Sequence, residues 1–169
     1  ELRLVRVGAA LTGSAETGPA KIANAAQATT AASHSNSGGV LMLSVAAPPN
    51  NSVAGRKLWV LKADPQFTLI KGGLVSTPDG TVLQNWMRAC LKRDQVCATG
   101  AQALQVVSVG IATTDANGHA QTPPLPAGRY WVLGDAKVDN KRVMWNQPVV
   151  VKGADTSLTL DQHNSMAVE

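Results

Sequence analysis

The chain has few residues of the types that catalyse reactions, and their spacing matches no common catalytic motif. Its three histidines are His34, His119 and His163, and its two cysteines are Cys90 and Cys97. The sequence contains no Gly-x-Ser-x-Gly, His-Glu-x-x-His or Cys-x-x-Cys pattern, and no Gly-rich Lys-Ser/Thr loop that could cradle a phosphate. We therefore predict no catalytic residue, no metal, no cofactor and no enzymatic activity.

Each histidine has a simple structural interpretation. His119 follows an Asn-Gly pair and is expected to be an exposed hairpin residue. His163 lies beyond the last predicted strand, where it could meet Asp161, but a solvated side chain near the chain end is the simpler interpretation. His34 lies in a polar segment. An enzyme with an assembled site would need a pocket that gathers His119 or His163 with two acids.

The two cysteines favour a disulfide, with two buried free thiols or a nucleophilic Cys90 as alternatives. A lone pair of cysteines cannot form a structural zinc site without histidines at ligand spacing. Along one continuous helix, residues seven apart rise about 10.5 Å, whereas a disulfide needs Cα atoms about 4.4–6.8 Å apart. Cys90 and Cys97 can therefore bond only if the chain turns near residues 92–95. A disulfide implies an oxidising compartment, hence a periplasmic, secreted or cell-surface location.

The net charge of +4 comes from scattered basic residues, and no long run of like charges exists. With a single Tyr and a single Phe, a platform for stacking bases is poorly supported, so we predict no nucleic-acid partner. The small basic clusters are Arg88/Lys92/Arg93 and Lys137/Lys141/Arg142. The candidate binding surface consists of Arg88, Lys92, Arg93 and Trp86.

Three tryptophans, Trp59, Trp131 and Trp145, fall in predicted strands and could form a platform for a sugar ring. Burial in the core is the alternative. A carbohydrate site requires that at least one of these residues or Trp86 is accessible to solvent.

The 169 residues, 44% of them hydrophobic, suit a single domain. No apolar run approaches the roughly 18 residues that span a bilayer, so no transmembrane segment is predicted. Residues 1–37 comprise a strand-like start at 2–7 and a polar, Ala/Ser-rich arm that buries too little to fold alone. Residues 38–169 are predicted to form the folded domain.

Alternating apolar residues predict strands in the folded domain. Leu41, Leu43 and Val45 alternate with polar or less buried positions, and a second strand at 56–62 follows the turn formers at 48–52. We expect these two strands to pair antiparallel. Further strands are predicted around 107–111, 130–133, 143–151 and 158–160, with turns at 115–118, 123–128 and 152–155.

The hydrophobic period changes to that of a helix within residues 76–104. Leu83, Trp86, Met87, Cys90 and Leu91 share one helical face. The first helix should begin with a capping box formed by Thr81 and Gln84. Asp94 could cap a second short helix, although Gly100 weakens that prediction.

Three segments together resemble a known group of β-sandwich domains. They are residues 48–61, residues 113–118 (Thr-Thr-Asp-Ala-Asn-Gly) and residues 125–132 (Leu-Pro-Ala-Gly-Arg-Tyr-Trp-Val). Their order is similar to that of carboxypeptidase-regulatory-like, transthyretin-like (prealbumin-like) and Cna-B-type domains, in which a T-D-x-x-G turn precedes an L-P-x-G-x-Y corner. The residues that carry the resemblance are Asp115, Gly118, Leu125, Pro126, Gly128 and Tyr130.

The resemblance covers about residues 38–161. It implies a mainly β fold, an immunoglobulin-like or transthyretin-like antiparallel sandwich with a short helical insert at about 78–104. The insert departs from the family pattern, so it either caps an open end or carries something particular to this protein.

Such domains occur as surface adhesins, as appendages to hydrolases and in exported proteins. We therefore expect a non-catalytic binding or structural module of an exported protein. It would contact another protein, or another copy through the N-terminal arm or a sheet edge. An accessory carbohydrate-binding domain of a secreted hydrolase is the alternative.

Overall fold

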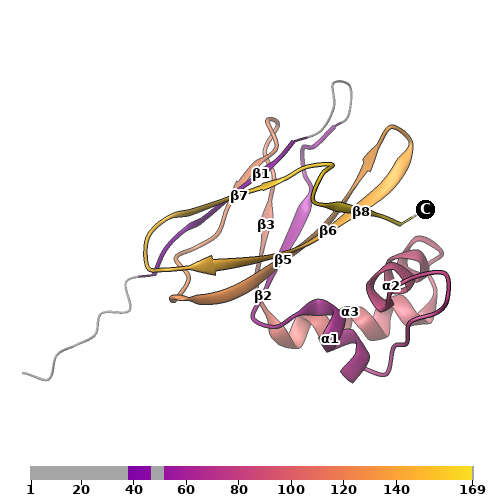
Figure 1. Cartoon of the computed structure of the whole chain (residues 1–169). Helices are drawn as coiled ribbons and strands as arrows, with labels where there is room; N and C mark the ends of the chain where they lie inside the picture. The colour runs from indigo at the N-terminus through magenta and orange to yellow at the C-terminus, as the bar shows by residue number, and fades with distance from the viewer. Residues whose placement is uncertain (1–37, 47–51, 169) are drawn as a thin grey trace, which may run out of the picture. The chain divides into compact units, whose positions relative to one another are not determined.

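The computed structural model describes residues 38–46 and 52–168, so the predicted strand at 2–7 and the polar arm lie outside the described residues (Figure 1). The described elements are, in chain order, β1 (Leu41–Val45), β2 (Lys57–Leu61), α1 (Pro65–Lys71), α2 (Val82–Leu91), α3 (Gln95–Val107), β3 (Ser108–Thr113), β4 (His119–Gln121), β5 (Gly128–Val138), β6 (Lys141–Val151), β7 (Thr156–Leu160) and β8 (Ser165–Ala167).

The strands form two sheets, which confirms the predicted β-sandwich with a helical insert. One sheet has three strands in the order β4-β1-β7, and the other has five in the order β3-β2-β5-β6-β8. Neighbouring strands are antiparallel except β1 and β7, which run parallel. The predicted pairing of the first two strands is wrong, because β1 and β2 belong to different sheets.

The main hydrophobic core lies between the two sheets. Leu41, Leu43 and Val45 of β1 are buried while Met42 between them is half-exposed, as the alternation predicts. The other members of this core are Leu58, Val60, Ala112, Leu125, Tyr130, Val132, Ala136, Val138, Val143, Trp145, Val149, Val151 and Leu160.

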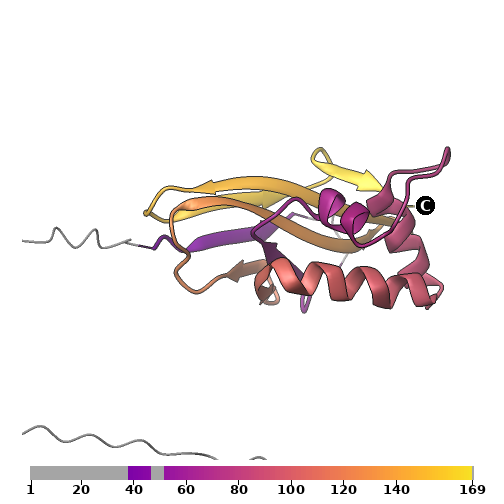
Figure 2. The same cartoon turned by 90° about the horizontal axis from the view of Figure 1, so that it is seen from below.

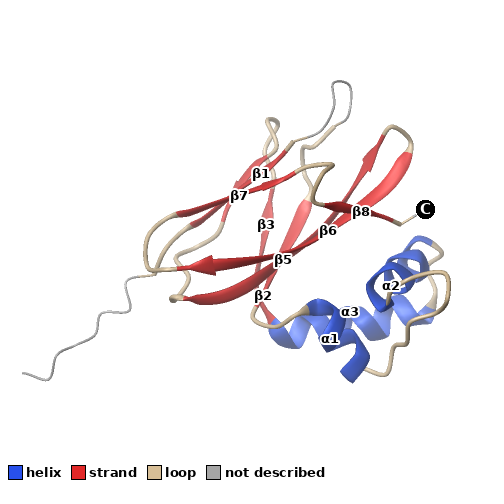
Figure 3. Cartoon of the chain, viewed as in Figure 1, coloured by secondary structure: helices blue, strands red, loops and turns tan. Residues whose placement is uncertain are grey.

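A second core lies on the opposite face of the five-stranded sheet, where the helices cover it. Leu61, Leu133 and Met144 point away from the first core and are buried. From the insert, Leu69, Leu83 and Leu104 pack against this cluster. Figure 3 shows the three helices gathered on one side of the sandwich, away from β1 and β7. The insert therefore covers a sheet face and does more than close an open end.

The insert is longer than the sequence predicts, because its helices run from Pro65 to Val107 (Figure 2). Helix α1 has only seven residues, too few to show a period, although Asp64 caps it and Pro65 occupies its first turn. The capping box of α2 is confirmed, with Thr81 and Gln84 bonding reciprocally. Asp94 caps α3, which is also confirmed, but α3 extends over thirteen residues.

Two strands differ from their predicted form. Val107 closes α3, so β3 begins one residue later, and its Ile111 lies half-exposed on the outer face while Ala112 is buried. Strand β8 is absent from the prediction because three residues give no visible alternation. Pro148 lies in the part of β6 beyond Trp145, where the pairing with β8 ends, as expected for proline near a sheet edge.

The two predicted corner motifs are formed. Tyr130 is buried, and its hydroxyl donates to the carbonyl oxygen of Pro126 at 2.8 Å. At the other motif, Gly118 has φ of 82° and its backbone closely approaches β1, so a side chain there would meet the carbonyl oxygen of Val45. This turn leads from β3 in one sheet to β4 in the other, and therefore does not form the predicted hairpin around His119.

Replacing Gly100 by alanine should destabilise the insert, although alanine favours helices by about 1 kcal/mol. A β-carbon at position 100 would collide with Cδ1 of Trp86 and approach Cδ2 of Leu69 at 3.0 Å. We expect Gly100→Ala to lower the free energy of unfolding by about 1–3 kcal/mol, measured by urea denaturation. Gln102→Ala, at an exposed position of α3, is the control and should change it by less than about 0.5 kcal/mol. Equal stability of both variants would refute the close packing.

Candidate functional site

The predicted basic surface is only partly available to a partner. Arg88 donates from Nε to the carbonyl oxygen of Val168 at 2.8 Å and from Nη1 to that of Asp79 at 3.1 Å. It thereby ties α2 to the end of the chain and to the preceding loop. Lys92 and Arg93 are exposed just after α2, where cations complement the helix dipole.

Trp86 lies beneath the surface, so its predicted place on an exposed binding surface is wrong. It is 6% exposed, and its Nε1 donates to the carbonyl oxygen of Cys97 at 3.1 Å. Its ring occupies the space that Gly100 leaves open on α3. The apolar face of α2 that carries Trp86 is covered by α3, and the ring reaches the edges of two surface hollows.

The predicted disulfide between Cys90 and Cys97 is formed, with Cα atoms 4.6 Å apart. The chain leaves the helical path after Leu91, and Arg93 adopts a positive φ of 56° before α3 begins. This is the turn between the cysteines that the geometry demands. The bond joins the end of α2 to the start of α3 and fixes the two helices against each other.

The insert displays an unusual share of exposed apolar side chains. Of the eight large apolar residues that are exposed in the described part of the chain, five belong to the insert. These five residues, here called the apolar insert surface, are Phe67, Ile70, Val75, Val96 and Val106. Isolated exposed apolar residues are common, but their concentration in the insert favours a contact surface there.

A cavity of about 300 Å³ lies in the insert and is here called the insert cavity. Val75 and Val96 line it, so the exposed residues continue directly into the hollow. Its walls come from the loop after α1 and from the facing sides of α2 and α3. The remaining lining residues are Gly72, Gly73, Leu74, Thr77, Asn85, Trp86 and Thr99.

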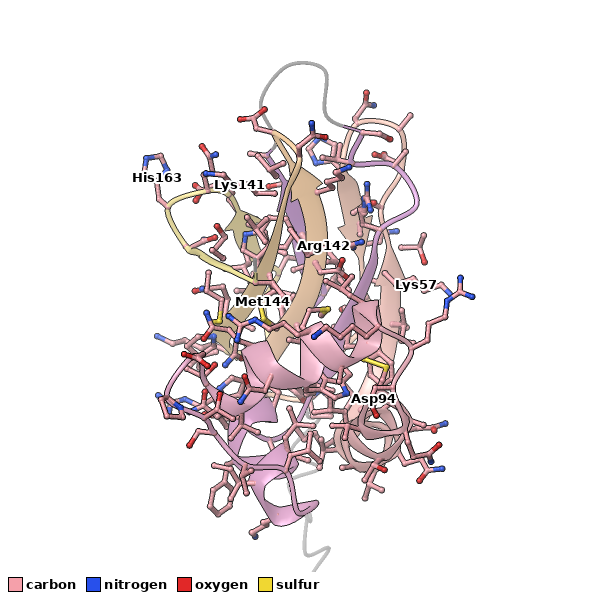
Figure 4. All side chains as sticks on the ribbon, turned by 90° about the vertical axis from the view of Figure 1, so that its right-hand side faces the viewer. Lys57, Asp94, Lys141, Arg142, Met144 and His163 are labelled. Atoms are coloured by element: carbon pink, nitrogen blue, oxygen red, sulfur yellow. A yellow bond between two sulfur atoms is a disulfide. The ribbon has the colours of Figure 1, made fainter. Side chains whose placement is uncertain are left out.

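A second hollow of about 330 Å³ lies between α2 and the outer face of the sheet, and is here called the β2–α2 cleft. Trp59 of β2 and Leu133 of β5 line it from the sheet, and Trp86 and Met87 line it from α2. Its charged lining residues are Arg56, Lys57, Asp135 and Arg142. Figure 4 shows Lys57 and Arg142 on the side of the sheet that faces α2.

The residues of this cleft were mostly missed in the sequence. Asp135 resembles a turn residue, but it lies within β5 and forms an ion pair with Arg142 of β6. The overlooked signal is the pair Asp139 and Asn140, whose positive φ values of 48° and 63° form a two-residue hairpin turn. That turn fixes the register in which Asp135 lies opposite Met144 and Arg142 lies two residues from Met144, diagonally across the ladder from Asp135.

A third hollow, of about 550 Å³, lies on the outer face of the three-stranded sheet. Asp115 and His119 line it together with the hydroxyl-bearing Ser44 and Ser157. The Asp115 carboxylate is already engaged, because its Oδ1 accepts from the backbone N–H of Asn117 at 2.8 Å and of His119 at 2.9 Å. This hollow therefore brings His119 together with one acid, and not with the two acids named in the sequence analysis.

The remaining candidate residues give no catalytic or metal constellation in the described ranges. His163 is exposed as predicted, with its Nδ1 3.7 Å from Asp161. Residues 38–46 and 52–168 contain no cluster of three or more His, Cys, Asp or Glu that could hold a metal ion. The helices in these ranges are too short or too polar to cross a membrane.

The strand tryptophans have different environments. Trp145 is buried in the main core, where its Nε1 donates to the carbonyl oxygen of Asp161 at 2.7 Å. Trp131 is half-buried, and the guanidinium of Arg129 lies 5.9 Å from its ring centroid. Trp59 is half-buried and borders the β2–α2 cleft. The solvent access that a carbohydrate site requires is therefore met at Trp59.

The Asp115 turn should weaken in acid. The N–H of His119, followed by that of Asn117, holds the pKa of the Asp115 carboxyl below its ordinary value of 3.8. A depressed pKa means that the turn is stabilised above pH 3.8 and loses this contribution as the pH falls through the lower folded-state value. NMR titration of the carboxyl should give a midpoint below 3.8. A higher midpoint would show that the carboxylate is not held by these donors.

The disulfide should stabilise the insert by about 2 kcal/mol, as expected for a short closed loop. We expect the double substitution Cys90→Ser with Cys97→Ser, and reduction of the native chain, to lower the free energy of unfolding by this amount. Hydrogen exchange in α2 and α3 should accelerate in both cases. The control is addition of reductant to the double variant, which should have no effect. This role would be contradicted if the free energy of unfolding of the native chain were the same with and without reductant.

Comparison with known proteins gives distant structural similarities only. No protein-family model matches the sequence, and no curated protein matches it. A Pseudomonas aeruginosa crystal structure, described as a "putative carbohydrate binding protein", is similar with 17% identity and a TM-score of 0.42, over 74% of this chain and 88% of that chain. The Bacillus anthracis TIE protein is similar with 15% identity and a TM-score of 0.35, over 73% of this chain and 16% of that one. The full-length major pilin RrgB of Streptococcus pneumoniae is similar with 12% identity and a TM-score of 0.37, over 72% and 30% respectively.

Proposed function

We propose that this chain is a non-catalytic binding module of an exported protein and that it binds another protein through the apolar insert surface. The observation that carries the proposal is the insert cavity, which is open and is lined by two exposed apolar residues, Val75 and Val96. Apolar side chains seated in such hollows supply most of the affinity of protein interfaces. The sandwich serves as the scaffold that presents this surface.

The insert is built to hold its surface rigid before a partner arrives. The Cys90–Cys97 bond joins α2 to α3, and the capping box of Thr81 and Gln84 fixes the start of α2. Gln84 also donates to the carbonyl oxygen of Ala167 at 2.8 Å, which ties α2 to β8. Rigid walls reduce the entropy lost on binding, so an apolar anchor gains more affinity there than on a mobile loop.

The charges of the insert indicate the chemistry of the partner. Residues 65–107 carry four cations and two acids, giving an excess of two positive charges. The carboxylate of Asp94 already accepts a hydrogen bond from the N–H of Val96, through which it caps α3. Lys92 and Arg93 are exposed near that cap. A partner that places an apolar side chain in the insert cavity, with carboxylates beside it, would complement this surface.

Export is supported by the disulfide, since such bonds persist in oxidising compartments and are rare in the cytosol. We accordingly place the protein in the periplasm, outside the cell or at its surface. The formed corner at Pro126 and Tyr130 supports the proposed relationship to carboxypeptidase-regulatory-like and transthyretin-like domains. Self-association through residues 1–37 or a sheet edge stays a prediction.

Peptide selection tests the proposed protein partner. Short random peptides displayed on phage would be selected against the oxidised full-length chain, and enriched sequences would be synthesised and measured by fluorescence polarisation. We expect enriched peptides to combine a large apolar residue with Asp or Glu. Val75→Glu and Val96→Glu should each weaken their binding by about ten-fold or more, because each places a carboxylate at the cavity.

The matched control is Val150→Glu, which makes the same change at an exposed position of β6 outside the insert. It should leave peptide affinity unchanged. The proposal fails if no enriched peptide binds saturably, if the enriched peptides are basic, or if Val150→Glu costs as much affinity as the two insert variants.

A further inference from the structure

An apolar row crosses three strands of the five-stranded sheet, and two of its members, Trp59 and Leu133, line the β2–α2 cleft. Trp59 of β2 lies directly between Ile111 of β3 and Leu133 of β5 in the sheet register. Leu133 is buried under the helices, whereas Ile111 is half-exposed. Trp59 is half-buried between them, so part of its indole faces the cleft. The sheet therefore places a partly accessible aromatic side chain in the cleft.

The rim of the cleft is charged and mainly positive. Three cations, Arg56, Lys57 and Arg142, line it together with one acid, Asp135. Lys57 is exposed, and Arg142 and Asp135 keep about a third of their side-chain surface accessible, at 30% and 31%. The cleft therefore offers polar groups of both signs with an excess of positive charge.

Donors and acceptors remain available on these groups. Arg142 uses Nη1 for Asp135, which leaves other N–H groups of its guanidinium for a ligand. The Arg56 guanidinium is held at the margin by the bond from Nη2 to the carbonyl oxygen of Ser52, at 3.0 Å. Asp135 can accept from ligand hydroxyls while it is paired with Arg142.

More positive charge lies around the hairpin that supplies Arg142. Lys137 and Lys141 are exposed near its tip, where Asp135 and Asp139 are the acids. Lys141 and Arg142 both belong to β6, and Lys57 lies on β2, two strands away in the same sheet (Figure 4). This end of the five-stranded sheet would therefore attract an extended anion before it reaches the cleft.

We propose that the β2–α2 cleft binds an anionic saccharide, with the sugar ring on the indole of Trp59 and its carboxylate or sulfate group on Arg142 and Lys57. A pyranose ring has an apolar C–H face and a hydroxyl-bearing edge, which match an indole bordered by Asp135 and the cations. Guanidinium groups bind carboxylate and sulfate through paired N–H donors. The cleft volume of about 330 Å³ is within the range of small-ligand sites.

The same features disfavour the other anionic polymers. A nucleic-acid strand would need successive aromatic platforms along a basic groove, whereas this cleft presents one accessible indole, that of Trp59. The saccharide site and the proposed protein-binding surface use different hollows, which have only Trp86 in common among their lining residues. Failure of the saccharide site would leave the proposed protein contact untouched.

Titration calorimetry with the oxidised full-length chain tests this site. The probes are a short oligomer of galacturonic acid, a sulfated oligosaccharide, a neutral galactose oligomer of the same length and a single-stranded oligonucleotide. We expect one of the two acidic saccharides to bind saturably, and the neutral oligomer to bind about ten-fold more weakly or not at all. Added salt should weaken the binding. The better of the two acidic probes identifies the anionic group.

Lys57→Gln and Arg142→Gln should each lower the affinity for the acidic saccharide by about ten-fold. The matched control is Lys152→Gln, which removes an exposed charge ten residues further along the chain than Arg142. It should have no effect. Trp59→Leu should also abolish saccharide binding. An unfolding curve would show whether this variant is folded, and if it does not fold, Lys57→Gln tests the proposal instead.

The proposal is overturned if no saccharide binds saturably, or if neutral and acidic oligomers bind with equal affinity. It is also overturned if Lys152→Gln lowers the saccharide affinity as much as Lys57→Gln does, or if the oligonucleotide binds more tightly than either saccharide. Peptides that bind the insert cavity should keep their affinity in Lys57→Gln, which separates this site from the protein-binding surface.

Discussion

The architecture depends on the burial of one sheet on both faces. Along β2, Leu58 and Val60 enter the core between the sheets, while Leu61 enters the core under the helices. The same division holds on β5, where Val132 and Leu133 are adjacent and face opposite cores. Without the insert, the outer side chains would be exposed to water at a cost of about 1.5–3 kcal/mol each. The helices are therefore needed for the stability of the fold, and the surfaces that they form are fixed as long as the domain is folded.

Local signals in the sequence predicted local structure well. Side-chain alternation in β1 and the capping residues Thr81 and Asp94 act over a few positions, and all were found where expected. Alternation tells which side chains share a face but not which strand lies alongside, so the partners of β1 were mistaken. Helix α1 and strand β8 were missed because neither is long enough to show a period.

The candidate sites were harder to predict because they are assembled from distant segments. Trp59 and Arg142 meet at one cleft although they come from β2 and β6, with the whole insert between them in the chain. Spacing in the sequence carries no trace of that proximity. Trp86 was misjudged for a related reason, since its burial depends on the absence of a side chain at Gly100 on another helix.

Trp86 has a consequence for how the two hollows influence each other. Its indole lines the insert cavity on one side and the β2–α2 cleft on the other. A ligand that moves this partition therefore reshapes the neighbouring space. Thermodynamic linkage requires this effect to be mutual. If a ligand in the insert cavity changes the affinity of the β2–α2 cleft by some factor, a ligand in the cleft changes the affinity of the insert cavity by the same factor. Such coupling would have to act against the hydrogen bond to Cys97 and the fit against Gly100, which hold the shared ring in place.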